Sequence, residues 1–95
     1  MPPPQLSQII SAGWFYNAGS QTLSKTFTFA NGFLPTWAFL QQLALYSHRA
    51  QHHPHIATKY NVVTLELHTD DEHSISDKDI KMAKKADSLF FQLTK

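Results

Sequence analysis

The first half of this 95-residue chain carries almost no charge. Lys25 is the only charged side chain between Met1 and Ser47, and nine of the twelve aromatic residues lie in the same segment. All seven acidic residues follow, between Glu66 and Asp87. A segment this apolar leaves a large hydrophobic surface in water unless something covers it. We therefore expect the first half to supply most of the core and also a contact surface for a second subunit.

Length and composition exclude several classes of protein. Ninety-five residues predict a single domain spanning residues 1–95, because a chain of this size forms one small core. The hydrophobic share of 42% is too high for a disordered chain, and no apolar run approaches the ~20 residues that cross a bilayer. The start of the chain lacks the basic and apolar regions of a signal peptide. We therefore predict a cytoplasmic protein with no membrane partner.

The basic residues do not form a pattern that binds nucleic acid. Arg49 is the only arginine among eight basic side chains, and four lysines near the end of the chain alternate with aspartates. Phosphate binding requires arginines and lysines clustered on one face. The alternation is typical of a solvated helix face, so we predict no nucleic-acid partner.

Hydrophobic periodicity predicts the order of helices and strands. Residues 6–12 can form a short helix, and residues 14–16 and 22–29 alternate as the two strands of an antiparallel hairpin. The main helix is expected at residues 34–51 and a further strand at 60–69. Ser76 and Asp79 predict a capping box that opens the last helix. This order predicts an α+β fold, with the helices on one face of an antiparallel sheet.

Two apolar stripes run along the predicted main helix. One contains Trp37, Leu40, Ala44 and Ser47, and the other contains Phe39, Leu43, Tyr46 and Ala50. Covering one sheet face requires only one such stripe. The second stripe favours a subunit interface, so we predict a homodimer or a homotetramer.

Four of the six histidines lie between residues 48 and 55, and they allow three interpretations. His48 and His52 are four residues apart at the predicted helix end, a spacing that can chelate a metal ion. A histidine pair at a helix end can instead supply acid–base groups, because imidazole titrates near neutral pH. The third interpretation is a set of exposed histidines without a chemical role. The chain has no cysteine, which excludes cysteine-based zinc sites.

His48 is followed by three residues and then by His52, His53 and Pro54. This spacing resembles the signature of the pterin-4a-carbinolamine dehydratase family, which has a charged residue or histidine, three spacers and His-His-Pro. Five further residues and an aromatic match Tyr60, and the pattern closes with an aspartate that matches Asp79. Alternating strands at 25–29 and 61–67 also agree. The resemblance covers about residues 13–90.

One position departs from the family pattern. Nine residues after the aromatic, the family has a further histidine or a tryptophan, whereas this chain has Asp70. His68 precedes it on the same predicted strand face, and His73 follows it in the predicted loop. The long N-terminal helix of the family is also shortened here, to residues 6–12.

The resemblance implies a fold and a reaction. The implied fold is a four-stranded antiparallel sheet with helices packed on one face. The implied enzyme is a hydro-lyase that dehydrates 4a-hydroxytetrahydropterin to quinonoid dihydropterin, and so recycles the tetrahydrobiopterin cofactor of aromatic amino acid hydroxylases. No cofactor or metal is implied beyond the pterin substrate. The alternative is a non-catalytic or weakly catalytic protein on the same fold, which binds pterin or promotes dimerisation.

The resemblance also implies roles for individual residues. The catalytic residues it implies are His52, His53 and, in place of the second family histidine, Asp70. The substrate-binding residues it implies are His48, His53, Pro54, His68 and His73. Tyr60 is expected to be structural.

Overall fold

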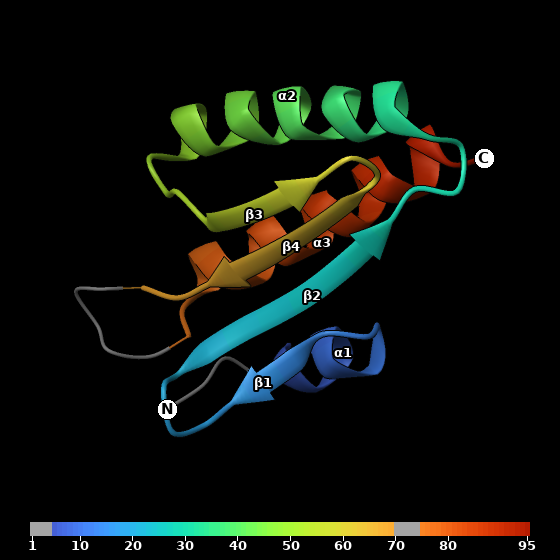
Figure 1. The fold of residues 1–95 in the computed structure, drawn as a ribbon. Helices are drawn as coiled ribbons and strands as arrows, with labels where there is room; N and C mark the ends of the chain where they lie inside the picture. The colour runs from blue at the N-terminus through green and yellow to red at the C-terminus, as the bar shows by residue number, and fades with distance from the viewer. Residues whose placement is uncertain (1–4, 70–74) are drawn as a thin grey trace.

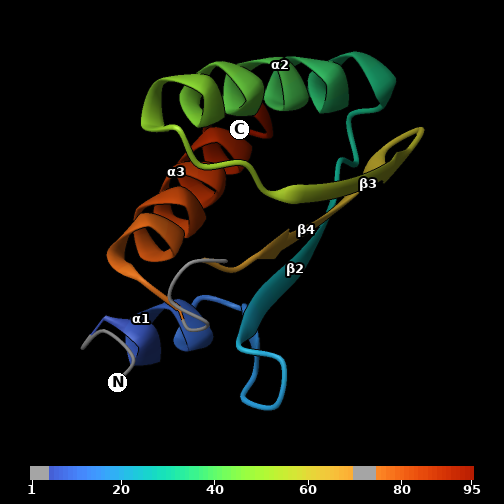
Figure 2. The same cartoon turned by 90° about the vertical axis from the view of Figure 1, so that its left-hand side faces the viewer.

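A computed structural model describes residues 5–69 and 75–95 as a four-stranded sheet with three helices (Figure 1). In chain order the elements are α1 (Leu6–Ser11), β1 (Phe15–Asn17), β2 (Thr22–Thr28), α2 (Phe33–Ala50), β3 (His55–Lys59), β4 (Val62–Leu67) and α3 (Asp77–Leu93). All strand pairs are antiparallel, in the order β1-β2-β4-β3. The helices lie on one side of the sheet (Figure 2). The predicted α+β fold is confirmed.

The two central strands have one covered face and one open face. Leu23 and Phe27 of β2 and Val63 and Leu65 of β4 are buried beneath the helices. The alternate residues point to the open face, where the hydroxyls of the paired residues Thr26 and Thr64 lie 2.9 Å apart. The alternation predicted for both strands is therefore confirmed, because a strand with one covered face repeats every two residues.

Four phenylalanine rings join the helices to the covered face. Phe27 of β2 and Phe29, one residue beyond the end of that strand, both contact Phe39 of α2 at a centroid distance of 5.2 Å. Both also contact Phe90 of α3, at 5.2 and 4.9 Å. Tilted and edge-on contacts of this kind add to the free energy gained from burial. Phe27, Phe29 and Phe39 of the first half therefore pack with Phe90 at the centre of the core.

Strand β3 was not predicted from the sequence. All five of its residues are exposed, and Ile56 is 39% exposed although it is the largest apolar side chain of the strand. Because β3 is an edge strand with every residue exposed, it shows no apolar alternation. A hairpin turn at Tyr60, with a positive φ of 52°, joins it to β4. The strand predicted at residues 60–69 therefore begins two residues later, at Val62.

The two predicted stripes of the main helix do not each occupy one face of α2. Phe39 and Leu43 are buried as one stripe required, but Leu40 and Ser47 of the other stripe are buried with them. Trp37 and Ala44 point outward instead, together with Leu34 and Leu45. A helix turns by about 100° per residue, so a buried arc that is wide enough to hold Phe39 and Leu43 also takes in Leu40 and Ser47 of the neighbouring stripe.

No described helix, α2 included, has the length and hydropathy needed to cross a membrane.

Lys25, the single charge of the first half, is held in a polar cluster at the side of the core. Its Nζ donates to Asp87 Oδ1 at 2.8 Å and to the Ala12 carbonyl at 2.9 Å. Trp14 Nε1 donates to the other oxygen of Asp87 at 3.0 Å. The ammonium also lies 5.2 Å from the centre of the Phe27 ring. The cluster ties the end of α1, strand β2 and helix α3 together.

We expect Asp87→Ala to lower the free energy of unfolding by about 1–3 kcal/mol. The Trp14 N–H then loses its acceptor and the Lys25 ammonium loses its counter-ion. Urea denaturation followed by circular dichroism measures the effect. Ser88→Ala, at an exposed position on the same helix, is the matched control. An Asp87→Ala protein with the urea midpoint of the wild type contradicts this account.

Candidate active site

A turn at the end of α2 sets the position of His52. The helix ends at Ala50, because Gln51 adopts the left-handed conformation with φ 53° and ψ 42°. The Gln51 N–H donates to the His48 carbonyl, and the His52 N–H donates to the Ser47 carbonyl at 3.1 Å. This pair of bonds is the Schellman motif, which satisfies the last carbonyls of a helix and redirects the chain. The helix therefore ends shortly before the predicted point.

The start of α3 supplies the other half of the site. Ser76 and Asp79 form the predicted capping box, and the Ser76 N–H donates to Asp79 Oδ2 at 3.0 Å. Asp79 is completely buried. A carboxylate in the first turn of a helix is stabilised by the unpaired N–H groups and by the helix dipole. This local chemistry keeps a charged group inside the protein.

His52 and Asp79 form a buried pair. His52 Nε2 lies 2.7 Å from Asp79 Oδ1, and the two side chains are 10% and 0% exposed. Thr69 Oγ1 donates to Asp79 Oδ2 at 2.7 Å. An ionised carboxylate only accepts hydrogen bonds, so the proton in the short bond belongs to Nε2 of His52. Within residues 5–69 and 75–95, no hydrogen bond reaches the other ring nitrogen, Nδ1.

Thr69 and Ser76 extend the pair into a chain of hydroxyl groups. Their Oγ atoms lie 2.6 Å apart. Because the Thr69 proton goes to Asp79, the Ser76 hydroxyl donates to Thr69. The carboxylate of Asp79 is thus held by side chains from the end of β4 and from the start of α3, and its orientation fixes that of the His52 ring.

The other predicted site residues lie at different depths. His53 is exposed directly after His52, and Pro54 is half-buried. His48 is exposed on the last turn of α2, and His68 is exposed after the end of β4. Asp70 and His73 lie outside the described residues. The structure therefore joins His52 to a buried carboxylate, and it places His53 and His48 near it in sequence but at the surface.

The metal interpretation depended on His48 and His52 sharing one face of a helix, and the structure does not have that arrangement. Because α2 ends at Ala50, His48 and His52 do not lie four residues apart on one helical face. Within residues 5–69 and 75–95, no group of three or more histidines, cysteines, aspartates or glutamates is placed to hold a metal ion. The absence of a metal requirement stays a prediction.

Sequence reasoning missed the partner of His52. Asp79 was identified as a helix-capping residue and as the last position of the family signature, but not as a member of the site. Asp79 lies 27 positions after His52, so no local sequence pattern can reveal their contact. Nothing in the sequence indicated that Thr69 belongs to the site. The signal that could have identified Asp79 is that it matches both the capping box and the family signature, because one residue seldom satisfies both by chance.

Comparisons with known proteins point to one family. The model of the family described as pterin 4 alpha carbinolamine dehydratase matches residues 2–89. A protein of Dinoroseobacter shibae with the provisional name pterin-4-alpha-carbinolamine dehydratase is 36% identical over 84 residues, which cover 88% of this chain and 86% of that protein. A protein of Saccharomyces cerevisiae with the same provisional name is 47% identical over 66 residues, or 62% of this chain and 55% of that protein.

Solved structures share the fold. A crystal structure from Brucella melitensis, described as a transcriptional coactivator/pterin dehydratase, superposes with a TM-score of 0.83 at 30% identity, over 94% of this chain and 96% of that one. A pterin dehydratase-like protein described as a RuBisCO assembly factor in the alpha-carboxysome has a TM-score of 0.70 at 26% identity, over 81% and 88% of the two chains. These descriptions include both an enzyme and a protein that assists assembly.

We expect neutral His52 to carry its proton on Nε2. Nitrogen-15 chemical shifts of the two ring nitrogens, recorded above pH 8, measure the tautomer directly. Asp79→Ala should remove the preference, whereas His53, which is exposed, serves as the internal reference for an unconstrained ring. A His52 ring protonated on Nδ1 in the wild type is incompatible with the pairing described above.

Proposed function

This chain belongs to the pterin-4a-carbinolamine dehydratase family, and we propose that it dehydrates a 4a-hydroxytetrahydropterin to the quinonoid dihydropterin. In this reaction the bond between C4a and the hydroxyl oxygen breaks. The hydroxyl gains a proton and leaves as water, and a ring nitrogen of the pterin loses its proton. No oxidant or reductant takes part. The product is the form from which the pterin cofactor of aromatic amino acid hydroxylases is regenerated.

The buried pair of His52 and Asp79 is the observation that carries this proposal. Loss of hydroxide from a pterin requires a proton donor of near-neutral strength at a fixed position, and imidazole is the side chain best suited to that task. Asp79 holds the ring through Nε2, so the protonated ring presents Nδ1–H to the leaving hydroxyl. The carboxylate also stabilises the positive charge on the ring, as in the histidine–aspartate pairs of hydrolases.

The remaining roles follow from position and exposure. His53 is exposed beside His52, so we assign it to binding and orienting the pterin ring. Pro54 disfavours helical geometry at His53, in a segment that the left-handed Gln51 has already turned away from α2. His48 and His68, both exposed, are assigned to the outer part of the substrate site.

Asp70 is proposed as the second acid–base group, in the place where the family has a histidine or a tryptophan. An ionised aspartate can accept the proton from the ring nitrogen but cannot donate one to the hydroxyl. The roles then divide, with His52 as the acid and Asp70 as the base. His73, in the same stretch of sequence, is proposed as a substrate-binding residue.

A second candidate function is binding without turnover. The observation that favours it is the exposed outer face of α2, where Leu34 and Leu45 are 78% and 58% exposed and no charged residue intervenes. A surface of this kind is suited to a protein partner. One structural neighbour is described as a RuBisCO assembly factor, and another as a transcriptional coactivator/pterin dehydratase. The fold therefore also occurs in proteins whose descriptions name a role in assembly or in transcription.

Our proposal includes a homo-oligomeric protein that works in the cytoplasm. The apolar face of α2 supports self-association. The cytoplasmic location stays a prediction from the sequence.

We expect His52→Ala to lower kcat for a freshly generated carbinolamine by about 10²–10⁴-fold. The matched control is His55→Ala, because His55 is an exposed histidine on edge strand β3. Both variants should be assayed with and without a chelator, after circular dichroism has shown that they are folded. If the wild-type protein dehydrates the carbinolamine no faster than the spontaneous reaction, the enzyme proposal is wrong and the binding function remains.

The division of roles between His52 and Asp70 has its own test. Asp70→Ala should lose most of the activity, and Asp70→His should keep or increase it, because a histidine there restores the family residue. His68→Ala and His73→Ala should weaken substrate binding, seen in KM, more than they lower kcat. If Asp70→Ala matches the wild type while one of the two histidine variants is inactive, the base is that histidine.

A further inference from the structure

Two kinds of contact hold the second oxygen of the Asp79 carboxylate, and they come from different parts of the chain. The Ser76 N–H donates to Oδ2 at 3.0 Å, and the Ser76 hydroxyl lies 3.5 Å from the same oxygen. Both belong to the capping box, so they fix the carboxylate only relative to its own helix, α3. Thr69 Oγ1 donates to Oδ2 at 2.7 Å, from just after the end of β4. Within residues 5–69 and 75–95, this is the one hydrogen bond to Oδ2 that comes from outside the start of α3.

The plane of this carboxylate depends on its partners, because the last torsion of an aspartate is soft. The χ2 angle of aspartate has broad energy wells, so the neighbouring groups decide how the two oxygens are oriented. Rotation of the plane moves Oδ1, which lies 2.7 Å from His52 Nε2. A change in the contacts of Oδ2 therefore changes the position of the imidazole ring.

The Thr69 hydroxyl is itself held in the direction in which it donates to Asp79. Its single proton goes to the carboxylate, so the Ser76 hydroxyl, at 2.6 Å, donates to the Thr69 oxygen. Hydrogen bonds in such a chain strengthen one another. Thr69 is also half-buried, so water competes less for its hydroxyl than it does at the surface. The contact between Thr69 and Asp79 is therefore a defined one.

Thr69 lies in the stretch of the chain to which substrate contacts are assigned. Figures 1 and 2 show the end of α2, the end of β4 and the start of α3 at the same end of the molecule. In the sequence His68 directly precedes Thr69, and Asp70 directly follows it. The Thr69 hydroxyl therefore joins the segment assigned to the substrate to the pair assigned to proton donation.

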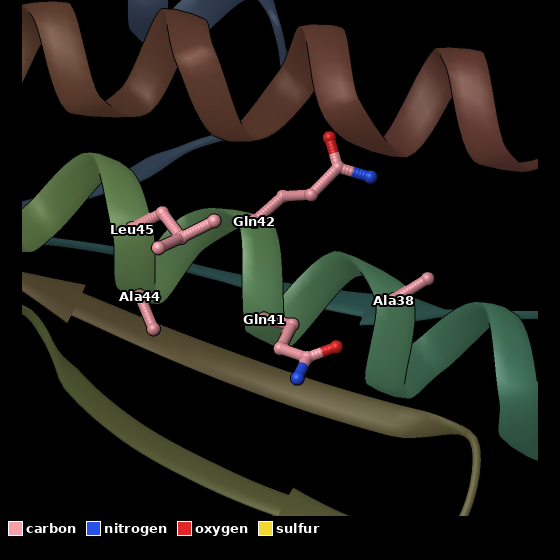
Figure 3. Close-up of a pocket in the computed structure, with 5 residues that line it drawn as sticks. All are labelled: Ala38, Gln41, Gln42, Ala44 and Leu45. Carbon is pink, nitrogen blue, oxygen red and sulfur yellow. The ribbon is translucent and has the colours of Figure 1, made fainter.

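The hollow on the outer side of α2 does not offer another place for this chemistry. Its volume is about 380 Å³, and Figure 3 shows the five residues that line it, Ala38, Gln41, Gln42, Ala44 and Leu45. None of these five side chains exchanges a proton near neutral pH. The proton donor of the proposed reaction therefore stays with His52, and its placement depends on the contacts of Asp79.

We propose that Thr69 is a positioning residue of the dehydration, which fixes the His52–Asp79 pair relative to the end of β4. This inference rests on the proposed function. Thr69 acts through the orientation of the carboxylate and exchanges no proton with the pterin. Its hydroxyl keeps the ring of His52 where Nδ1–H can meet the leaving hydroxyl, while Nε2–H stays bonded to Asp79. A displacement of a reacting group by about 1 Å can cost about 100-fold in rate, so one hydroxyl is enough to matter.

Two substitutions separate the hydroxyl of Thr69 from its shape. Thr69→Val keeps the shape and removes the hydroxyl, so it should lower kcat by about 10- to 100-fold and change KM by less than about threefold. Thr69→Ser keeps the hydroxyl and should retain kcat within about threefold of the wild type. The matched control is Thr26→Val, which removes a hydroxyl contact of 2.9 Å to Thr64 on the open face of the sheet and should leave kcat unchanged. A Thr69→Val protein with the kcat of the wild type, or a Thr69→Ser protein as slow as Thr69→Val, overturns the proposal.

A double-variant cycle tests whether Thr69 acts through Asp79. Asp79→Asn keeps an oxygen for the capping box and removes the charge that holds the ring. In the Asp79→Asn protein, Thr69→Val should change kcat by less than about twofold, because its route to His52 is already broken. Losses that multiply in the double variant mean that Thr69 acts by another route, and they contradict the proposal.

A spectroscopic measurement makes the test independent of turnover and of the folding of Asp79→Asn. The proton on His52 Nε2 lies in a 2.7 Å bond between side chains that are 10% and 0% exposed. Its NMR resonance should be visible in the wild type, in Thr69→Ser and in Thr26→Val, because its exchange with water is slow. In Thr69→Val the resonance should be broadened or lost, while circular dichroism shows that the fold is kept.

The same spectra distinguish failure of this inference from failure of the proposed reaction. If the wild type is active and the Thr69→Val resonance matches that of the wild type, the positioning role is wrong and the reaction stands. If the spectra are as expected but the wild type has no dehydratase activity, the reaction is wrong and the contact between Thr69 and the pair stands.

Discussion

The buried carboxylate of Asp79 is the interaction on which both the fold and the site depend. It accepts hydrogen bonds from the ring of His52 after α2, from Thr69 after β4 and from Ser76 at the start of α3. Thr69 and Ser76 also contact each other through their hydroxyl groups, at 2.6 Å. A buried carboxylate without its partners costs several kcal/mol, so each partner is required by the others. The same atoms therefore contribute to the proposed reaction and to the stability of the fold, which limits the substitutions that are tolerated around Asp79.

The fold could be predicted where the sequence carries a periodic or a local signal. Strands β2 and β4 bury every second residue, so period-two alternation located them. The capping box located the start of α3 because that signal is local. Strand β3 was missed because none of its side chains is buried. On α2 the sequence indicated that two faces are apolar, but only the packed structure decides which of Leu40 and Trp37 points inward.

The site divides in the same way. The family signature located His52, His53 and Pro54, since it is written in consecutive residues. It also contained Asp79, but the pairing of that residue with His52 is a tertiary contact, and Thr69 enters the network only through the path of β4. The charge asymmetry of the chain now has a physical explanation as well. Trp14, Phe27, Phe29 and Phe39 of the first half are buried in the core, and its single ammonium is paired with Asp87. Much of the apolar remainder lies on the outer face of α2.

The hydroxyl contact between Thr69 and Ser76 has a consequence for how such a protein can diversify. The chain passes Asp79 at Thr69 and returns to it at Ser76, with the two oxygens 2.6 Å apart. Ile75, just before the return, is buried in the core. Thr69 and Ser76 are thus two anchors, seven positions apart in the sequence, that the Asp79 carboxylate holds in place. Substitutions at the positions between these anchors can therefore give proteins of this fold new specificities while the anchors and the His52–Asp79 pair stay unchanged.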